Sequence, residues 1–289
     1  MIYPYGYPEH MPRSGYSRTG IGRQPGGNGR IRSTRKGAQA VGMSGRGAVP
    51  DGLLSHAGYV LAVVAHPDDE SFGLGAVLAR LTAGGVPCGV LCFTRGEAST
   101  LHATAADLAP ARSAEFAAAA EELRLDRADL REYADGGLSA VPLAELAGVV
   151  LQAARTAAPS HLLAFDTGGV TGHVDHARAT VAALAAAEVL GVPVLGWALP
   201  DAVARALNVE FGTAFAGRAA AEIDEVLTVD RAAQRRAIGC HASQSTTNPV
   251  LWRRLELLGD TEHLRLLSAV SPQGRPAPGA GTSRTETRK

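Results

Sequence analysis

Cysteine is scarce in this chain, with three residues among 289. So few thiols exclude the disulfide framework that holds many small secreted domains together. Cys88 and Cys92 are four residues apart on an expected strand, where their side chains share one face. We expect both to be small buried residues of a protein from a reducing compartment. Cys240 is expected to be buried in a helix as well, because a reactive thiol needs an accessible, electropositive setting.

Long apolar runs are also missing. The longest apolar region, residues 181–199, is rich in alanine and is interrupted by Glu188, Gly191 and Pro193. These interruptions favour a helix, a turn and a strand over a membrane span. The first residues do not resemble a signal peptide either. We therefore expect a cytoplasmic protein without a membrane span.

The net charge is zero, but the charges are segregated along the chain. Residues 1–50 carry eight Lys and Arg against one Glu, a net charge of +7. Residues 271–289 carry a net charge of +3, which leaves −10 on residues 51–270. A mildly acidic core indicates no nucleic-acid-binding face.

The two basic ends differ from the centre in composition. Residues 1–50 hold eleven Gly and no apolar periodicity, so we expect a disordered N-terminal extension. Contact of its Tyr and Arg residues with RNA or a partner is one alternative, and a true start of translation near Met43 is another. Residues 271–289 are expected to be a disordered tail. Residues 51–270 then form one folded domain.

Strand and helix patterns alternate through this central domain. The expected strands are 59–65, 86–93, 129–133, 161–165, 192–198 and 223–229. The expected helices are 72–83, 110–123, 142–157, 173–190, 231–241 and 249–258. Repeated strand–helix units predict a Rossmann-like, doubly wound α/β fold, a mostly parallel sheet with helices on both faces. Ligands of such sheets bind beyond the carboxyl ends of the strands.

A dense polar cluster, His66-Pro67-Asp68-Asp69-Glu70, directly follows the first expected strand. His66 and Asp69 offer nitrogen and oxygen ligands that suit zinc. Asp68 lies between them and projects differently, so it is free to accept a proton from a water on the metal. Pro67 stops the strand, and Glu70 is expected to be a first-turn helix charge or a partner of a ligand.

A second cluster supplies what the first one lacks. His173 and His176 are three residues apart at an expected helix start, so both can face one cavity. His176 can complete a set of two His and one Asp, and His173 can then stabilise an oxyanion. Asp175 can orient one of the histidines. Either cluster alone is also compatible with a charged helix N-cap.

Together, segments 65–70 and 172–176 resemble those of the PIG-L/LmbE-like deacetylases. These are zinc-dependent enzymes that remove acetyl groups from substrates containing N-acetylglucosamine. The resemblance covers roughly residues 58–245. It extends to segments 94–98, 112–115, 135–138 and 241–244.

The resemblance implies a role for each polar residue of the two clusters. His66, Asp69 and His176 would bind one Zn²⁺ per chain, with another divalent ion such as Fe²⁺ as an alternative. Asp68 would be the general base. His173 would stabilise the oxyanion or protonate the leaving amine.

Residues outside the clusters are implicated in the same way. Arg112 would lie beside the substrate pocket. Arg95 and Glu97 would bind substrate, although a loop salt bridge explains them equally well. A further supporting group is expected at His241, Ser243 and Gln244.

The leading hypothesis is hydrolysis of an N-acyl amide, with acetyl as the expected acyl group, on an amino sugar or a related small molecule. Such an enzyme is a zinc-dependent N-deacetylase or amidohydrolase. An amidase of a thiol conjugate or secondary-metabolite amide with the same zinc site is an alternative. A non-catalytic ligand-binding domain is an alternative from another class. The sequence carries no signal for an oligomeric state.

Overall fold

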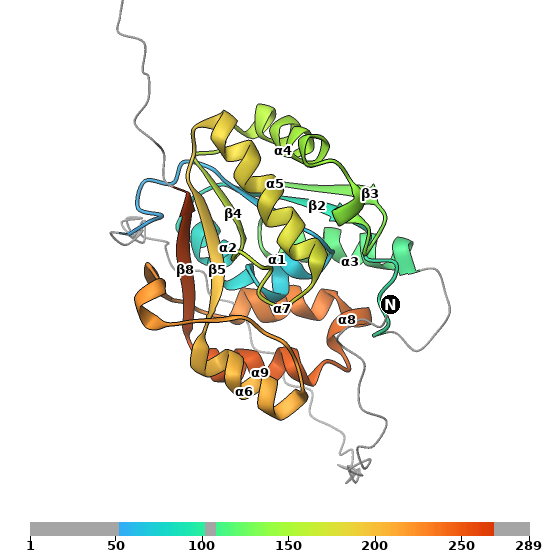
Figure 1. Ribbon diagram of the computed structural model, residues 1–289, viewed down its shortest axis with the longest axis vertical. Coiled ribbons are helices and arrows are strands. Elements are labelled where there is room, and N and C mark those ends of the chain that lie inside the picture. Colours follow the sequence, from blue (N-terminus) through green and yellow to red (C-terminus); the bar gives the residue numbers. More distant parts are fainter. Residues whose placement is uncertain (1–51, 102–107, 269–289) are drawn as a thin grey trace, which may run out of the picture.

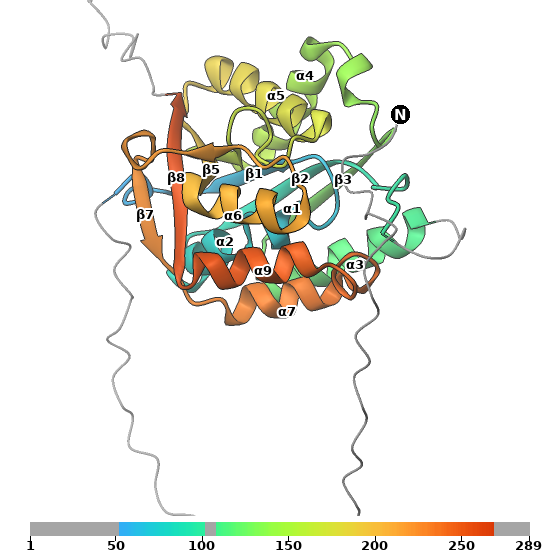
Figure 2. The same cartoon turned by 60° about the horizontal axis from the view of Figure 1, so that its bottom comes forward.

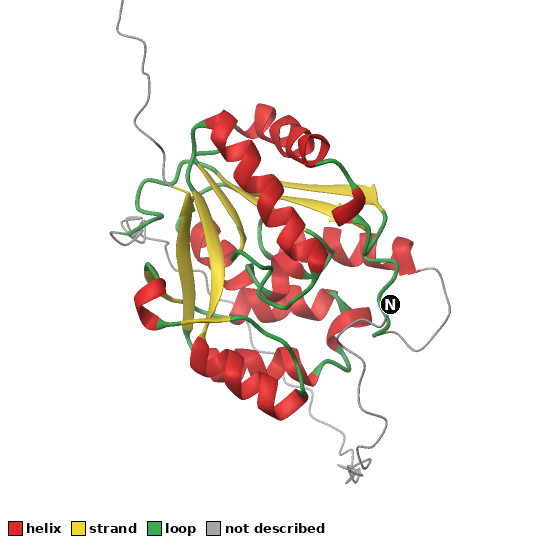
Figure 3. Cartoon of the chain, viewed as in Figure 1, coloured by secondary structure: helices red, strands yellow, loops and turns green. Residues whose placement is uncertain are grey.

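The fold is known from a computed structural model, which describes residues 52–101 and 108–268. The expected N-terminal extension and C-terminal tail lie outside the described residues. The described part of the chain forms an 8-stranded sheet with helices on both sides (Figures 1 and 3). This is the α/β architecture that the alternating patterns predict.

Strand β1 (Val60–Val64) lies inside the sheet, and all five of its residues are buried. It pairs in parallel with β2 (Cys88–Thr94) on one side and β4 (His161–Phe165) on the other. Apolar runs of this kind are typical of parallel strands that helices cover on both faces. The strand order is β3-β2-β1-β4-β5-β8-β7. Because the order reverses between β1 and β4, a crevice is expected at their carboxyl ends.

The other strands are β3 (Arg127–Tyr133), β5 (Val194–Pro200), β6 (Gly217–Arg218), β7 (Glu225–Thr228) and β8 (Thr261–Ser268). The helices are α1 (Asp69–Phe72), α2 (Gly75–Ala83), α3 (Leu108–Glu122), α4 (Leu143–Ala157), α5 (Val174–Leu190), α6 (Asp201–Phe211), α7 (Ala232–Cys240), α8 (Ala242–Ser245) and α9 (Pro249–Leu258), with short 3₁₀ turns at Leu138–Ala140 and Ala220–Glu222.

Alternate residues of β1 pack into two separate hydrophobic cores, because successive side chains along a strand point to opposite faces of the sheet. Leu61 and Val63 pack with α4 and α5 on one face. Ala62 and Val64 pack with the cluster that includes residues of α2, α3, α6 and α7 on the other. Figure 2 shows these two helical layers above and below the sheet.

The first expected helix, 72–83, is wrong as a single element. Its residues 75–83 form α2, and a separate short helix, α1, begins before it at Asp69 and ends at Phe72. The chain passes very close to β4 at this break, where a Cβ on Gly73 would lie 2.5 Å from the ring of Phe165. Only glycine fits so near a buried ring. Asp69 and Glu70 of the polar cluster thereby lie in the first turn of α1, and Asp68 is its N-cap.

Two elements at one edge of the sheet were not expected. Helix α6 follows β5 directly, and β8 pairs antiparallel with both β5 and β7. Strand β8 lacks a plain apolar alternation because one of its fully buried positions is Glu262. This carboxylate pairs with Arg231 at 2.5 Å and accepts a hydrogen bond from the indole of Trp197 at 2.7 Å. Among the described residues, no helix is both long and apolar enough to cross a membrane.

Candidate metal and active site

The corner after β1 is held in an unusual backbone conformation. Asp68 has a φ of 118°, a left-handed value that costs a non-glycine residue on the order of 1–3 kcal/mol. The Asp69 carboxylate folds back over the strand end and accepts hydrogen bonds from the backbone N–H groups of Ala65 and His66, at 3.2 and 2.9 Å. The backbone N–H of Asp68 donates to Glu70 Oε2 at 2.9 Å. These contacts direct Asp68 and Asp69 to different sides.

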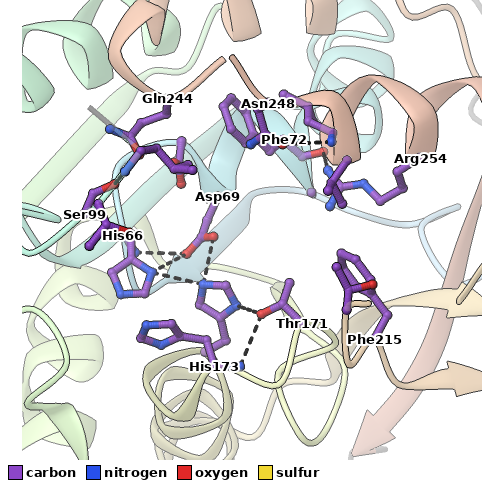
Figure 4. A pocket seen from close by; sticks show the side chains of 18 of the residues that line it. His66, Asp69, Phe72, Ser99, Thr171, His173, Phe215, Gln244, Asn248 and Arg254 are labelled. Carbon is purple, nitrogen blue, oxygen red and sulfur yellow. Dashed lines mark hydrogen bonds and ion pairs between the residues drawn. The ribbon is translucent and has the colours of Figure 1, made fainter. Parts of the chain in front are cut away.

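Ligand atoms of three side chains from the two clusters converge at the β1–β4 edge (Figure 4). His66 Nδ1 lies 3.0 Å from His176 Nε2, and His176 Nε2 lies 3.1 Å from Asp69 Oδ1. His66 Nδ1 lies 3.7 Å from Asp69 Oδ2. Ligands about 2.0–2.1 Å from a tetrahedral zinc ion are about 3.3 Å apart. The spacing of the two ring nitrogens and the Asp69 carboxylate therefore suits this ion.

Polar contacts on the far side of each ring indicate which nitrogen faces the triad. His176 Nδ1 lies 2.8 Å from Thr171 Oγ1 and 3.3 Å from the carbonyl oxygen of Gly169. Because a carbonyl only accepts, the proton belongs on Nδ1 and the lone pair on Nε2. His66 Nε2 in turn lies 3.0 Å from Asp135 Oδ1. Two lone pairs and one carboxylate thus face one another, an arrangement that calls for a cation.

The carboxylates around His66 also favour positive charge there. Burial lowers the pKa of His66, but Asp135 and Asp175 oppose this effect and raise the pKa to about 10. Burial likewise disfavours the charged form of Asp69, yet His176 holds its pKa well below the usual range. The triad therefore combines an ionised carboxylate with a position that attracts a proton or a metal ion.

Asp175 connects the second cluster to a loop after β3. Its Oδ2 lies 3.6 Å from His66 Nε2 and accepts a hydrogen bond from Gly136 N at 2.8 Å. Its Oδ1 accepts from Leu138 N at 3.1 Å. The side chain is fully buried. Asp175 thus fixes both His66 and the loop that carries Asp135.

Asp68 lies beside the triad and is paired with Arg112. The guanidinium donates to Asp68 Oδ2 at 2.9 Å, to Gly96 O at 2.5 Å, and to Pro67 O. Burial raises the pKa of Asp68 to about 6, although Arg112 opposes this effect. A carboxylate with such a pKa can take up a proton near neutral pH.

His173 is the N-cap of α5 and lines the same cavity. Its Nδ1 accepts a hydrogen bond from Asp175 N at 3.1 Å, so its proton lies on Nε2 when the ring is neutral. Burial, reinforced by His66 and His176, lowers the pKa of His173 to about 4. His173 is therefore a neutral donor next to the triad, with 4.6 Å between its ring centroid and that of His66.

The other expected residues divide into two groups. His241 Nε2 forms a hydrogen bond with Glu70 Oε1 at 2.6 Å, and both side chains are fully buried. The Ser243 hydroxyl donates a hydrogen bond to Glu115. Gln244 accepts a hydrogen bond from Ser99 Oγ at 2.6 Å. Arg95 instead forms an ion pair with Glu132, and Glu97 accepts from the backbone N–H of Asp135 at 2.9 Å. Neither Arg95 nor Glu97 lines the cavity formed by the described residues, and their substrate role stays a prediction.

Sequence reasoning overlooked two contributors. Asp135 was noted only as part of a motif, yet its carboxylate holds His66 Nε2. Thr171 was not considered, although it contacts His176 Nδ1. A threonine in a loop carries no sequence signal of its own. An aspartate followed by two glycines after a strand does carry one.

The comparisons with known proteins agree with this geometry. Residues 61–188 match the family described as PIG-L: GlcNAc-PI de-N-acetylase. A 1D-myo-inositol 2-acetamido-2-deoxy-alpha-D-glucopyranoside deacetylase from Nocardia farcinica is 30% identical over 249 residues, which cover 66% of this chain and 82% of that protein. The chain belongs to the PIG-L family. A protein of the same name from Kineococcus radiotolerans is 33% identical over 184 residues, 52% of this chain and 51% of that protein.

Members of the PIG-L family thus share sequence with this chain over different lengths. The chain spans about half the length of the first two curated relatives, those from Kineococcus and Streptomyces griseus. Solved structures share the fold. N,N'-diacetylchitobiose deacetylase from Pyrococcus horikoshii has a TM-score of 0.55 at 21% identity, covering 74% of this chain and 85% of that one. GalB, a 4-carboxy-2-hydroxymuconate hydratase from Pseudomonas putida, has a TM-score of 0.57 at 17% sequence identity. The match covers 75% of this chain and 98% of GalB.

Proposed function

We propose that this chain is a zinc-dependent hydrolase that removes an acyl group from the nitrogen of an amino sugar or a related small molecule. The observation that carries this proposal is the converging set of two imidazole lone pairs and one carboxylate, with Asp68 beside it at a cavity. Residues 51–270 would form the catalytic domain. The names of the relatives support an N-acetylated amino sugar as the substrate class.

In this proposal His66, Asp69 and His176 hold the metal ion. When bound, Zn²⁺ supplies Lewis-acid stabilisation of negative charge and lowers the pKa of a water molecule. Asp135 and Thr171 keep each imidazole in the orientation that binding requires. Such supporting contacts raise the affinity of a site because the ligands need no rearrangement.

Asp68 acts as the general base. Its carboxylate takes the proton of the attacking water, and Arg112 holds it at the correct side of the triad. The proton then passes to the nitrogen of the amide as the C–N bond breaks. The products are a carboxylate and a free amine.

His173 acts as a hydrogen-bond donor to the oxygen of the amide carbonyl. Negative charge grows on this oxygen when the carbonyl carbon becomes tetrahedral. A preorganised neutral donor stabilises that charge more than the ground-state carbonyl. The hydrogen bond from Asp175 N to His173 Nδ1 leaves the proton on the ring nitrogen that can do this.

A purely structural role for the polar corner fits less well. The Asp68 carboxylate pairs with Arg112 and makes no capping hydrogen bond to the first turn of α1. Asp69 bonds to the end of β1 instead. The site therefore contains a strained backbone at Asp68 and buried charged groups, neither of which a helix cap requires.

The test is release of carboxylate from a panel of N-acetylated amino sugars, with and without a chelator. We expect amine formation that stops after chelation and returns when Zn²⁺ is added. Turnover that persists without any bound metal would contradict the proposed role of the triad. Thermal melting with and without Zn²⁺ serves as a readout that is independent of substrate.

A further inference from the structure

The cavity beside the candidate metal site has two ends of different chemistry. It has a volume of about 460 Å³. One end is polar, with Asp68, Ser99, Arg112, Asp135 and Gln244. The other end, here called the apolar wing, has the apolar side chains of Phe72, Phe165, Phe211, Phe215, Val250 and Leu251, and the polar lining residues Asn248 and Arg254 lie on the same side. Figure 4 shows Ser99 and Gln244 on the His66 side and Phe215 on the opposite side.

The apolar wing begins directly at a metal-ligating residue. The ring of Phe165 meets the ring of His176 edge to face, with 4.8 Å between the centroids. Its other walls come from α1, α6 with the loop after it, and the start of α9. A group attached to a carbonyl carbon at the triad can therefore extend into the wing without leaving the cavity.

Polar side chains around the wing already have partners within the protein. Asn208 bonds to the backbone of Phe215 through both its amide oxygen and its amide nitrogen, at 2.8 and 3.0 Å. Asn248 Oδ1 accepts from Leu251 N at 3.0 Å, and Arg254 donates to a carbonyl oxygen of α1 at 2.7 Å. These contacts fix the walls, so the wing offers a ligand mainly hydrocarbon surface.

We propose that the apolar wing binds the acyl group of the substrate and that this group is an aliphatic chain longer than acetyl. The inference rests on the proposed function. The hydroxyl groups of an amino sugar need polar partners, and the polar end of the cavity supplies them. The hydrocarbon surface matches the remaining part of an N-acylated amino sugar, its acyl chain. Water adds across the amide C–N bond, the chain leaves as a carboxylate, and the amino group keeps a proton.

The inference is tested with glucosamine carrying N-acetyl, N-butanoyl, N-hexanoyl or N-octanoyl groups. We expect kcat/KM to rise by about fourfold for each methylene that the wing buries, until the wing is filled. A profile that is flat or highest for acetyl would overturn the inference and leave the proposed function standing. No amine from any of these compounds would overturn the proposed function, and this inference with it.

A second substrate comparison decides which part of the substrate enters the wing. Octyl N-acetylglucosaminide places the same chain on the sugar oxygen. We expect it to be hydrolysed no faster than simple N-acetylglucosamine. A higher kcat/KM for the octyl glycoside than for N-octanoylglucosamine would show that the wing holds the aglycone, which would overturn the assignment to the acyl group.

Matched variants test the location. Val250→Trp narrows the wing, whereas Val209→Trp places the same side chain on α6 at a position that is 88% exposed and outside the cavity. We expect the octanoyl-to-acetyl ratio of kcat/KM to fall by about tenfold or more in Val250→Trp and to stay unchanged in Val209→Trp. The near-isosteric Val250→Thr, which perturbs folding less, should lower the ratio by a smaller factor. Equal ratios in all variants would overturn the inference.

Discussion

At the scale of single residues, the site depends on the separation of Asp68 from Asp69. Two adjacent carboxylates on a regular helix would be about 100° apart around the helix axis, and both would face the same environment. Here the left-handed φ of Asp68 places one carboxylate on Arg112 and the other on the end of β1. One residue can then act as a base while its neighbour binds the ion.

Replacement of Asp68 by Asn therefore separates chemistry from binding. The amide cannot take up a proton, so we expect kcat to fall by about 10²–10⁴-fold. Zinc content should stay at the wild-type level because Asp68 is not a ligand. Metal analysis and amine release on the same sample check both statements, and near-wild-type turnover would refute the assignment of the base.

Asp135→Ala tests the support of His66. Loss of the carboxylate leaves His66 Nε2 without its 3.0 Å partner, and we expect zinc affinity to fall by about 10–100-fold. Asp135→Asn keeps an acceptor atom at this place and should have an intermediate effect. Competition with a chromogenic chelator measures both affinities. Equal affinity in the wild type and in Asp135→Ala would show that the contact is incidental.

At the scale of elements, the active corner exists because α1 and α2 are separate. The break lets α1 turn the polar cluster toward β4, and the close approach of Gly73 to Phe165 keeps it in place. Glu70 on α1 also bonds to His241 after α7, so that two distant segments hold one short helix. An element of four residues would not be stable without such contacts.

Gly73→Ala should therefore disturb this element. The added methyl group meets the ring of Phe165, and we expect a loss of about 1–3 kcal/mol in the free energy of unfolding. Gly148→Ala in the exposed part of α4 is the matched control, since a Cβ there has no neighbour within 4 Å. It should stabilise by about 0.5–1 kcal/mol. Urea unfolding of both variants measures the contrast, and two similar values would contradict the packing argument.

At the scale of the whole molecule, much of the site follows from the sheet. Parallel strands end at one edge, so clusters that follow β1 and β4 had to meet, and the sequence predicts this pairing. Helix α6 and strand β8 were not predictable in the same way. Buried Glu262 hides the apolar alternation of β8, and its partner Arg231 lies on a different segment. The apolar wing was not predictable from the sequence either, because each of its side chains follows the apolar pattern of an ordinary core residue.

Two histidines outside the candidate metal site contribute to the pH dependence of stability with a definite sign. Burial lowers the pKa of His161 and of His263. Both are neutral in the folded and unfolded states at high pH, but below about pH 6.5 the unfolded chain binds protons that the folded chain does not. The contribution of these two histidines to the free energy of unfolding should therefore fall as the pH falls through this range, whereas the raised pKa values of His66 and Asp68 act in the opposite direction. Urea unfolding between about pH 7.5 and 5.5 should show the wild type losing stability relative to His161→Gln/His263→Gln as the pH falls, and a constant difference between the two proteins would argue against it.

The most direct test of the account is the position of the metal. His66 takes part in two groups of ligand atoms, one with His173 and His176 and one with Asp135 and Asp175. Anomalous diffraction at the zinc edge from crystals grown with Zn²⁺ locates the ion. We expect a single peak between His66 Nδ1, Asp69 and His176 Nε2. A peak on the Nε2 side of His66, between Asp135 and Asp175, would contradict it.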